Sequence, residues 1–500
     1  MMNRLPKVSL YGLVILVFAM IASVTSQLAD PDFFWHLRAG QWMIENGKIP
    51  VNDPFLWTQT STPWMNHEWL SDVVFFAVHK IGGGTLISVL VGLLFGGSLA
   101  LLYQFLKLKA SPFLAILFTS AAAAVILPWA NCRPQAITYF LFTVYLFGLL
   151  RYQEDLKVSR LWMLPPIMIL WANLHGAFII GIVLIGMVAG LMTLEALWNM
   201  GMRNWRECLL KVRAIWVCWL ATIVAACLTP YGPKLLIHPF KVMKLWIVPY
   251  INEWQPAVFG HLSSAALFVL IGLWILVQVF RITKPSLFEL ALPFVFTVLS
   301  LSQIRQAPLA AIVLSASMAP QLNDVYARLL EVLKSKMKPS IFVSKASQDL
   351  GPIQYVINAL LAIAGVIGMV ILLHGKLDRQ LKQMDSLIGH SAIDLLAKQP
   401  QVGPIFNEYG YGGYLTWRLW PKQQAFIDGR ADMYSDQFAK DYIEISYGKP
   451  DWKARFDRYK FNTVVINREG PLRQLLVAED RFVELFSDDK VVVLVRKNPI

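Results

Sequence analysis

The chain has 500 residues, of which 56% are hydrophobic and 15% are charged, and its formal net charge is +13. A soluble protein has about half of its residues apolar and about a quarter charged, so this composition excludes an ordinary soluble protein. Apolar runs of about twenty residues recur along the chain, and each is long enough to cross the hydrocarbon core of a bilayer. The sequence therefore predicts an α-helical polytopic membrane protein.

Eleven membrane spans are predicted, near residues 8–26, 85–106, 112–129, 135–150, 161–174, 176–198, 214–229, 263–280, 287–303, 306–320 and 353–374. The fifth and sixth are separated only by the polar residues Asn173–His175. They form either one hairpin or a kinked, partly re-entrant pair. The first span follows Arg4 and Lys7 and is interpreted as an uncleaved anchor, because it is long for a signal peptide and no clear cleavage site follows.

Basic residues are distributed unevenly between the connections of these spans. The connections on one side, starting with the N-terminus, hold more than twice as many Lys and Arg residues as the longer loops opposite. The positive-inside rule makes the richer side cytoplasmic, so the N-terminus is cytoplasmic and the C-terminus extracytoplasmic after eleven crossings. The positive charge is thus a topology signal, and no nucleic-acid partner is predicted.

The first outer loop, residues 27–84, combines six carboxylates and three histidines with five tryptophans. Tryptophan favours a membrane–water boundary, and acids and imidazoles supply chemistry. Asp30 and Pro31 predict the start of a helix, which continues to about Asn46 and ends at Gly47. The loop is therefore expected to begin with an interfacial helix.

A second interfacial helix is predicted in the same loop. Asn66 is a good cap, and it places His67 and Glu68 in the first turn of this helix. The three glycines at 82–84 predict its end before the second span. On the preceding helix, Asp32 and His36 are four residues apart and share a face.

The other outer connections bring polar groups to the same level of the membrane. They contain Arg133, Asn173, His175, Lys234, Glu253 and Arg305. No acidic residue lies in the middle of a predicted span, which disfavours an ion-coupled transporter. Polar groups at the outer rim suit chemistry on a substrate whose reactive group lies at the membrane surface.

The tail changes character after the last span, which divides the chain into a transmembrane domain, 1–374, and an extracytoplasmic domain, 375–500. The tail is charged throughout and alternates short apolar strands with helical stretches, which is typical of a small α/β domain. Strands are predicted at 403–406, 424–427, 463–466, 482–486 and 490–495. Helices are predicted at 391–398, 437–446, 452–459 and 471–478.

Two features of the tail suggest a ligand. Three glycines within 410–413 resemble a glycine-rich turn, although no nucleotide-binding motif is present. Asp428, Arg430 and Asp432 follow the strand predicted at 424–427, where ligands of α/β domains bind. A salt-bridged turn is the alternative, and it is slightly favoured.

Short motifs in a fixed order along the chain carry a family resemblance. They read DPDFFWHLRAG, NDPF, NHEWL, RPQ, WANLHG, LTPYG, INEW, YGGYLTW and FIDGRADMY. Together they resemble a group of bacterial membrane proteins related to the GT-C glycosyltransferases, over nearly the whole chain. The resemblance implies a GT-C-like fold in the bacterial inner membrane and a sugar donor carried on polyprenyl phosphate or diphosphate. It also implies a catalytic carboxylate in the first outer loop, which would be Asp32 or Asp30.

Sugar transfer to a hydroxyl requires a base, and Asp32 or Asp30 could serve. The acceptor would be a lipid, a glycan or a protein. The leaving phosphate requires cations, and the candidates are Arg133, Arg305 and Lys234. Binding of the acceptor, or of a divalent ion such as Mg or Mn, is predicted for His36, His67, Glu68, Asn173, His175 and Glu253. The chain has no second D-x-D motif in a later loop, which leaves metal dependence open.

Each of these residues also has a structural alternative. Asp30 could be a plain helix cap, and Asp32 could complement the helix dipole. Arg133 and Arg305 could be interface anchors. For the chain as a whole, the alternative is a non-catalytic flippase, or a polysaccharide-export or assembly subunit, of the same topology.

Overall fold

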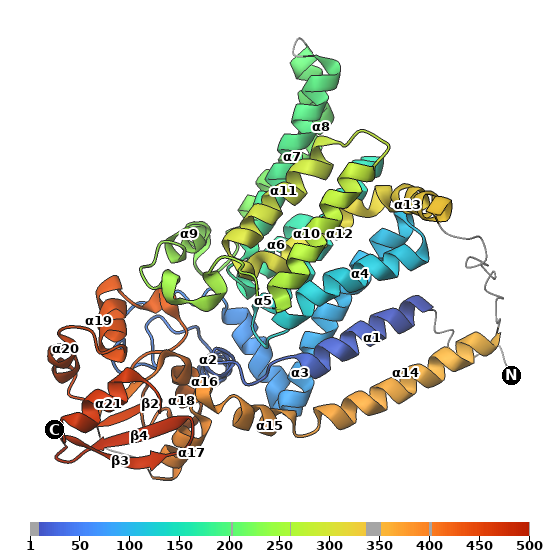
Figure 1. Ribbon diagram of the computed structural model, residues 1–500. Coiled ribbons are helices and arrows are strands. Elements are labelled where there is room, and N and C mark those ends of the chain that lie inside the picture. The colour runs from blue at the N-terminus through green and yellow to red at the C-terminus, as the bar shows by residue number, and fades with distance from the viewer. Residues whose placement is uncertain (1–9, 202–203, 261, 337–351, 400–402, 500) are drawn as a thin grey trace.

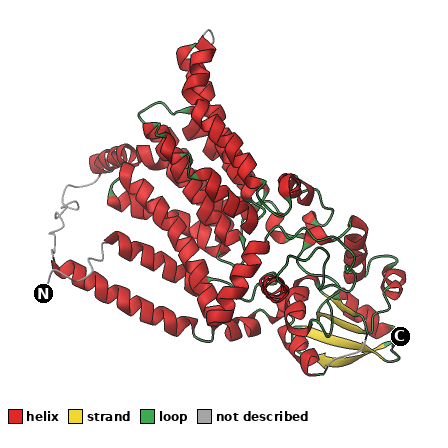
Figure 2. Ribbon diagram, turned by 180° about the vertical axis from the view of Figure 1, so that it is seen from behind, coloured by secondary structure: helices red, strands yellow, loops and turns green. Residues whose placement is uncertain are grey.

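The computed structural model describes residues 10–201, 204–260, 262–336, 352–399 and 403–499. These residues are mostly helical and include one small β-sheet, which lies near the C-terminus at one end of the molecule (Figures 1 and 2). Most of the remaining helices form a bundle beside this sheet (Figure 1). The basic pair Arg4 and Lys7 lies outside the described residues.

A helix lies at each of the eleven predicted span positions. These helices are α1 (Leu10–Thr25), α3 (Trp69–Lys109), α4 (Pro112–Ile126), α5 (Gln135–Asp155), α6 (Leu164–Leu174), α7 (Phe178–Met200), α8 (Trp205–Ala226), α10 (Leu262–Phe280), α11 (Leu287–Ser302), α12 (Ala307–Met318) and α14 (Pro352–Leu373). Further helices lie in the connections, at α2 (Phe33–Asn46), α9 (His238–Val242) and α13 (Leu322–Lys336).

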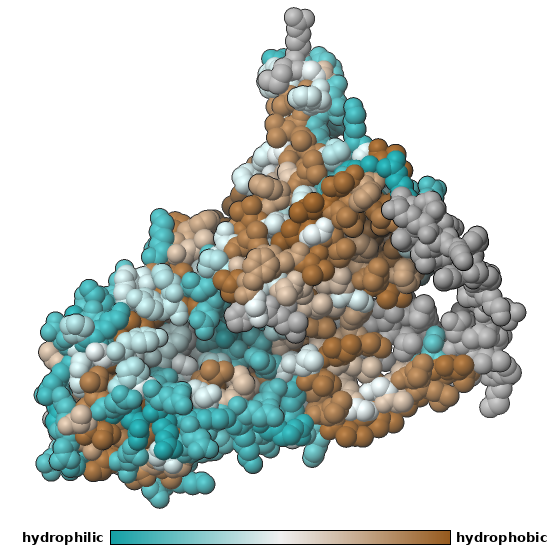
Figure 3. Space-filling model, in the orientation of Figure 1, coloured by the Kyte–Doolittle hydropathy of each residue, from teal (hydrophilic) through white to brown (hydrophobic). Residues whose placement is uncertain are grey.

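Within the described residues, five helical segments are long and apolar enough to cross a membrane. They are Trp69–Lys109, Pro112–Trp129, Phe178–Met200, Trp205–Ala226 and Val356–Leu373. The apolar surface gathers over the bundle and over α14, whereas hydrophilic surface covers the C-terminal end (Figure 3). A multi-pass membrane protein is thus supported, and the count of eleven crossings stays a prediction.

Close packing of α1 against α3 brings the two ends of the first outer loop together. A Cβ atom on Gly96 would lie 2.6 Å from the Cβ of Ala19, and one on Gly92 would lie 1.8 Å from the Ser23 hydroxyl. Small residues with this spacing allow helices to approach closely in a membrane. The loop therefore begins and ends at the same end of the α1–α3 pair.

The first helix of the loop begins later than the sequence predicts. It starts at Phe33 rather than Pro31, because the Asp30 carboxylate accepts a hydrogen bond from the Asp32 N–H (2.9 Å). The Asp30 carbonyl accepts another from the Phe33 N–H (3.2 Å). Asp30 thus builds a turn before the helix. The predicted end is confirmed, since Gly47 has φ 65° and donates its N–H to Met43 O.

The second helix of the loop ends at the glycines, as predicted. Two helices meet within α3 (Trp69–Lys109) at a kink, where Gly82 and Gly83 have non-helical dihedral angles. Gly83 has φ 57° and ψ −155°, a conformation that glycine adopts without the steric cost other residues meet. The helix begins at Trp69, so His67 and Glu68 precede it rather than forming its first turn.

Four of the five predicted strands are confirmed. They are β1 (Ile405–Asn407), β2 (Thr463–Asn467), β3 (Phe482–Ser487) and β4 (Val491–Arg496). Their order in the sheet is β1-β2-β4-β3, with β1 parallel to β2 and the other pairs antiparallel. The C-terminal region also contains α15 (Lys376–Gln383), which follows α14, and α16 (Asp385–Ile388), α17 (His390–Lys398), α18 (Gly412–Leu419), α19 (Asp436–Ser446), α20 (Trp452–Arg458) and α21 (Pro471–Ala478) around the sheet.

The segment 424–427 is not a strand of this sheet, so that prediction was wrong. The Asn407 side chain forms hydrogen bonds with the backbone of this segment. Its amide oxygen accepts from the Phe426 N–H (2.8 Å), and its amide nitrogen donates to Ile427 O (2.8 Å). A side-chain amide has replaced the neighbouring strand as hydrogen-bond partner. On its other side the segment forms an isolated parallel bridge between Ala425 and Leu56 of the first outer loop.

The glycines at 410–413 serve packing rather than a phosphate-binding turn. Tyr409–Tyr411 form a short 3-10 turn, and α18 begins at Gly412. A Cβ on Gly413 would lie 2.1 Å from Pro31 O, and one on Gly412 would lie 1.9 Å from Ile427 O. The missing side chain of Gly413 lets α18 approach the first outer loop, and that of Gly412 lets it pack on the backbone of the segment 424–427.

The C-terminal region is docked on the first outer loop by further hydrogen bonds. The Trp57 N–H donates to Ala425 O (3.2 Å), and the Trp57 indole donates to Ile405 O (3.2 Å). The Thr58 hydroxyl donates to Phe426 O (2.9 Å). These contacts place the turn that follows Ile427 directly over the polar residues of the loop.

Candidate functional site

The carboxylate–arginine cluster consists of five charged residues from four connections, namely Asp30, Asp32, Arg133, Glu253 and Arg305. Arg133 lies at its centre, with Nε 2.6 Å from Asp30 Oδ1. One terminal nitrogen lies 3.0 Å from Asp32 Oδ2 and 3.2 Å from Glu253 Oε2. A guanidinium that binds three carboxylates fixes the relative position of the first loop and two later connections.

Arg305 completes the cluster from a fourth connection. Its guanidinium lies 3.5 Å from Glu253 and 4.5 Å from the centre of the Trp254 ring. The helical turns η7 (Asn252–Trp254) and η8 (Ile304–Gln306) are joined by the Ile304 N–H, which donates to Gln255 O (2.9 Å). Arg305 has only this one distant carboxylate partner among the described residues, so it is the cation of the cluster most available to an anion.

Exposure separates the two aspartates. The Asp30 side chain is 3% exposed, whereas that of Asp32 is 20% exposed. Asp30 uses its carboxylate within the protein, on Arg133 and on the Asp32 backbone. Asp32 presents an accessible carboxylate, which is oriented by a hydrogen bond from the Trp35 indole (3.3 Å). Of the pair, only Asp32 therefore has a carboxylate that solvent can reach.

Burial sets the charge state of this cluster. It raises the pKa of the Asp32 carboxyl, and the Arg133 guanidinium partly counters that rise. Burial opposes the charge of Arg133 itself, but Asp30, Asp32 and Glu253 raise the pKa of its guanidinium well above the usual value. For Glu253 burial would raise the pKa, and Arg133 with Arg305 lowers it. Arg133 and Glu253 stay charged, while Asp32 is a stronger base than an ordinary aspartate.

A second set of polar residues adjoins the first, and we call it the histidine cluster. It consists of His36, His67, Glu68, His175, His238 and Asp432. Glu68 is its centre, with carboxylate oxygens 3.8 Å from His36 Nε2, 3.7 Å from His67 Nε2 and 3.4 Å from His175 Nε2. Burial raises the pKa of Glu68 to about 7, and His36 opposes that rise.

Two of these imidazoles are neutral. Burial lowers the pKa of His36 to about 4 and that of His175 well below its usual value. His36 Nδ1 lies 2.6 Å from Asp72 Oδ1, and Asp72 also accepts from the Asn66 amide (2.7 Å). An imidazole that donates Nδ1–H to Asp72 keeps an acceptor nitrogen facing Glu68.

His175 is held by a chain of hydrogen bonds from the neighbouring helices. The Trp171 indole donates to the Thr138 hydroxyl (2.8 Å), which lies 2.7 Å from His175 Nδ1. The Ala177 N–H also points to this nitrogen (3.4 Å). Nδ1 is thus an acceptor, so the remaining proton lies on Nε2, which faces Glu68.

The turn 428–432 of the C-terminal region closes over both clusters. The Arg430 guanidinium lies 2.7 Å from Asp53 and 2.7 Å from Asp428, with all three side chains fully buried. It also lies 4.5 Å from the centre of the Trp64 ring. The salt-bridged turn is therefore confirmed for Asp428 and Arg430. A Cβ on Gly429, between them, would lie 1.7 Å from Asp32 Oδ1.

Asp432 of the same turn has a different environment. It lies in η12 (Ala431–Met433), with Oδ2 3.3 Å from His238 Nε2 and 4.0 Å from His67 Nδ1. These three residues are the group of metal-type donors found within the described residues. Of the residues predicted to hold a divalent ion, this group includes only His67. Asp30 and Asp32, which were predicted as catalytic carboxylates and not as metal ligands, both contact the Arg133 guanidinium.

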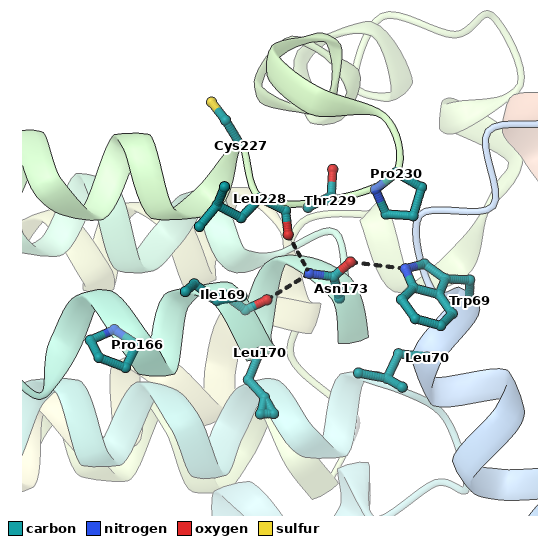
Figure 4. Close-up of a pocket in the computed structure, with 10 residues that line it drawn as sticks. All are labelled: Trp69, Leu70, Pro166, Ile169, Leu170, Asn173, Cys227, Leu228, Thr229 and Pro230. Carbon is teal, nitrogen blue, oxygen red and sulfur yellow. Dashed lines mark hydrogen bonds between the residues drawn. The ribbon is translucent and has the colours of Figure 1, made fainter.

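A shallow, open apolar cavity of about 740 Å³ lies beside Trp69 and Asn173, which are close in sequence to Glu68 and His175 of the histidine cluster (Figure 4). Its walls come from the start of α3 and the ends of α6 and α8, and they are Trp69, Leu70, Pro166, Ile169, Leu170, Asn173, Cys227, Leu228, Thr229 and Pro230. The Asn173 amide accepts from the Trp69 indole (2.9 Å) and donates to Ile169 O (2.7 Å) and Leu228 O (3.0 Å). Its polar atoms are thus used within the wall, and the cavity presents hydrocarbon.

Most residues predicted from the sequence meet at this site, although from distant segments. Lys234 differs, because it is exposed on η5 (Gly232–Leu236) and belongs to none of the ion pairs among the described residues. His238 and Asp72 were not among the predicted site residues. The signal available for His238 was only its place on a polar outer connection, and Asp72 could be found only as one of several acids in the first loop.

No protein-family model matches the chain, and no curated protein matches it. Among solved structures, ArnT from Cupriavidus metallidurans in the apo state is similar, with a TM-score of 0.51, 14% identity and coverage of 97% of each chain. ArnT bound to undecaprenyl phosphate gives a TM-score of 0.50, 14% identity and 97% coverage of each. The archaeal oligosaccharyltransferase AglB from Archaeoglobus fulgidus gives 0.49 and 13% identity, over 91% of this chain and 69% of its own. The chain therefore shares the fold of ArnT.

Proposed function

We propose that this protein is a membrane glycosyltransferase that takes a sugar from a polyprenyl-phosphate or polyprenyl-diphosphate donor. The acceptor is a lipid, a glycan or a protein. The observation that carries the proposal is an accessible carboxylate, Asp32, beside Arg133 and Arg305 at the polar end of an apolar helix bundle. The shared fold with ArnT, which has been solved with undecaprenyl phosphate, supports the same class of donor.

The apolar cavity accounts for the lipid part of the donor. An isoprenoid tail needs a hydrocarbon surface that is continuous with the membrane, and the cavity offers one at the ends of α6 and α8. Trp69 in its wall directly follows Glu68 of the histidine cluster. A tail in this cavity therefore brings the phosphate that it carries to the polar clusters.

The carboxylate–arginine cluster accounts for the chemistry. Asp32 takes the proton of the acceptor hydroxyl, and that oxygen forms a bond to the anomeric carbon of the sugar. The bond from this carbon to the phosphate oxygen breaks, and polyprenyl phosphate leaves with the electron pair. Arg305 and Arg133 bind the departing phosphate, because guanidinium groups form bidentate hydrogen bonds to phosphate. Asp30 acts through Arg133 as a positioning residue.

The predicted topology puts this reaction on the outer face of the bacterial inner membrane. Basic residues are enriched on the opposite side of the predicted spans, which supports an extracytoplasmic site. The hydrophilic surface of the C-terminal region, at the same end as the clusters, agrees with an aqueous compartment there. We propose that 1–374 form the membrane domain and that 375–500 form the extracytoplasmic domain.

Purified protein in lipid nanodiscs tests the proposal directly. Polyprenyl-phosphate sugars with a radiolabelled sugar are supplied together with a membrane extract as the source of acceptors. Transfer of label from the donor to a new product supports the proposal. Movement of labelled lipid across proteoliposomes without any transfer would instead support the non-catalytic flippase alternative.

The close approach of Gly429 to Asp32 gives a first prediction. Gly429→Ala introduces a methyl group 1.7 Å from the present position of Asp32 Oδ1, so the carboxylate must move. Displacement of a reacting group by about 1 Å can cost about 100-fold in rate, and we expect a loss of that order in the label-transfer assay.

Gly190→Ala is the matched control for this variant. Gly190 lies in α7, and an added Cβ there meets no atom within 4 Å. Its transfer rate is expected to equal that of the unmodified protein. Full activity of Gly429→Ala, with donor binding unchanged, would show that the position of the Asp32 carboxylate does not control the reaction.

A further inference from the structure

His67, His238 and Asp432 come from three separate parts of the chain, and their side chains lie close together. His67 belongs to the first outer loop, His238 begins α9 and Asp432 lies in η12 of the C-terminal region. One donor atom from each residue lies within 4.8 Å of the others. We propose that a zinc ion binds between these three side chains.

The distances fit a tetrahedral ion with little rearrangement. Zinc–nitrogen and zinc–oxygen bonds of about 2.0–2.1 Å place neighbouring tetrahedral ligands about 3.3–3.4 Å apart. His238 Nε2 already lies 3.3 Å from Asp432 Oδ2. His67 Nδ1 lies 4.0 Å from the same oxygen and 3.3 Å from Met65 O, so binding requires it to leave Met65 O and to move by less than about 1 Å.

The present partners of His238 leave room for a ligand. Its Nε2 atom is buried, and it forms no hydrogen bond of good geometry among the described residues. Its partner is the Asp432 carboxylate, with Oδ2 at 3.3 Å, which is itself one of the three proposed ligands. A buried imidazole nitrogen without a hydrogen bond is costly, and coordination to a metal ion would satisfy it.

The donor set selects the kind of metal. Two imidazoles and one carboxylate suit zinc, whereas magnesium and calcium prefer oxygen ligands. Three protein ligands also leave a fourth position for water or for a substrate oxygen. The nearest further carboxylate is Glu68, whose Oε1 lies 3.7 Å from His67 Nε2.

A neighbouring glycine is consistent with this arrangement. A Cβ on Gly176 would lie 2.9 Å from His67 Cδ2. Any other residue at this position would push the imidazole away from its present place. Gly176 therefore allows the approach of His67 to the other two donors.

Zinc at this position would join the C-terminal region to the membrane bundle. The turn that carries Asp432 also carries Gly429, which packs on Asp32, and Arg430, which is buried against Asp53. A zinc ion bound by Asp432 together with His67 and His238 would hold this turn in place over the carboxylate–arginine cluster. The zinc site is thus a structural link beside the site of the proposed function, and its existence does not depend on sugar transfer.

Metal binding by the full-length protein in detergent tests the proposal without any activity assay. Protein stripped with EDTA is titrated with Zn²⁺ against a competing fluorescent chelator, and bound metal is counted by mass spectrometry. We expect one zinc ion per chain. His238→Gln and Asp432→Asn are each expected to weaken binding by at least about 10–100-fold, the loss that even an outer-sphere partner of a metal site can cause.

His390→Gln is the matched control. His390 also pairs with a carboxylate, Asp394 (3.5 Å), but it lies on α17 away from the three donors. Its zinc affinity should equal that of the unmodified protein. Equal unfolding temperatures in EDTA verify that the variants are folded. If His238→Gln does not fold, the zinc affinity of Asp432→Asn tests the proposal.

A second measurement tests whether zinc stabilises the folded protein. Saturating zinc should raise the unfolding temperature of the unmodified protein and of His390→Gln, because a ligand that binds only the folded state stabilises it. It should leave Asp432→Asn unchanged. Absence of saturable zinc binding by the unmodified protein, or an unchanged affinity in Asp432→Asn, would overturn the proposal.

Discussion

The Asp32→Asn variant is expected to lose sugar transfer by about 10²- to 10⁴-fold, the range over which a positioned general base contributes to rate. Asparagine has the size of aspartate, and it can still accept a hydrogen bond from the Trp35 indole and from Arg133. It cannot take the proton of the acceptor. The loss should therefore appear in kcat measured with the labelled donor, while donor binding changes much less.

Asp30→Asn distinguishes the role of Asp32 as the base from the role of Asp30 in positioning Arg133. Asp30 is 3% exposed and binds Arg133 and the Asp32 backbone, so its removal should loosen the arginine and weaken donor binding. Asp378→Asn, an exposed residue of α15, is the control and should leave the rate unchanged. An Asp32→Asn protein that folds and transfers sugar at the normal rate would refute the assignment of the base.

The Arg430→Met variant is expected to lower the free energy of unfolding by about 3–5 kcal/mol, the cost of leaving a buried charge without its partner. Arg430 is 1% exposed and lies 2.7 Å from each of two carboxylates, Asp53 and Asp428, whose side chains are 0% exposed. Methionine fills a similar volume but leaves both carboxylates without a cation. Chemical unfolding of the purified protein in detergent, followed by tryptophan fluorescence, measures the change.

Arg473→Met is the matched control for that variant. Arg473 pairs with Glu484 at the surface, and their side chains are 27% and 36% exposed. Exposed ion pairs contribute about 0–1 kcal/mol, so this variant should unfold almost like the unmodified protein. A difference between the two variants below about 1 kcal/mol would contradict the structural role of Arg430. Arg430→Lys keeps the charge but not the planar fork, and it should lie between them.

Arg430 also explains how the C-terminal region takes part in the site. The first loop supplies Asp53, and the C-terminal region supplies Asp428 and Arg430. Their buried network fixes the turn that covers Asp32. The tail is therefore more than an appended domain, since it forms one wall of the carboxylate–arginine cluster.

The sequence predicted those parts of the structure that short segments determine. A run of apolar residues must be helical to satisfy its backbone in a membrane, and a helix lies at every predicted span. Gly47 ends α2 as predicted, and four of the five strands are present. Polar groups on outer connections, together with the family resemblance, drew attention to Asp32, Arg133 and Arg305.

Local patterns failed where a distant partner competes for the same backbone. Asn407 takes the hydrogen bonds that would have made 424–427 a strand of the sheet. The local sequence of 424–427 allows both outcomes, and the deciding contact lies elsewhere in the chain. By contrast, the helix break at Gly82 and Gly83 was predicted correctly, because the dihedral angles there depend on the glycines themselves.

The sequence by itself determined that this chain is an apolar helical protein whose charged and imidazole groups gather on a few connections. Only the tertiary structure decided that Gly429 abuts Asp32 and that His67, His238 and Asp432 converge. The physical reason is the separation of the partners along the chain. Helix formation depends on residues that are close in sequence. These contacts join residues that are far apart in sequence, and they form only when the helices and the sheet have packed.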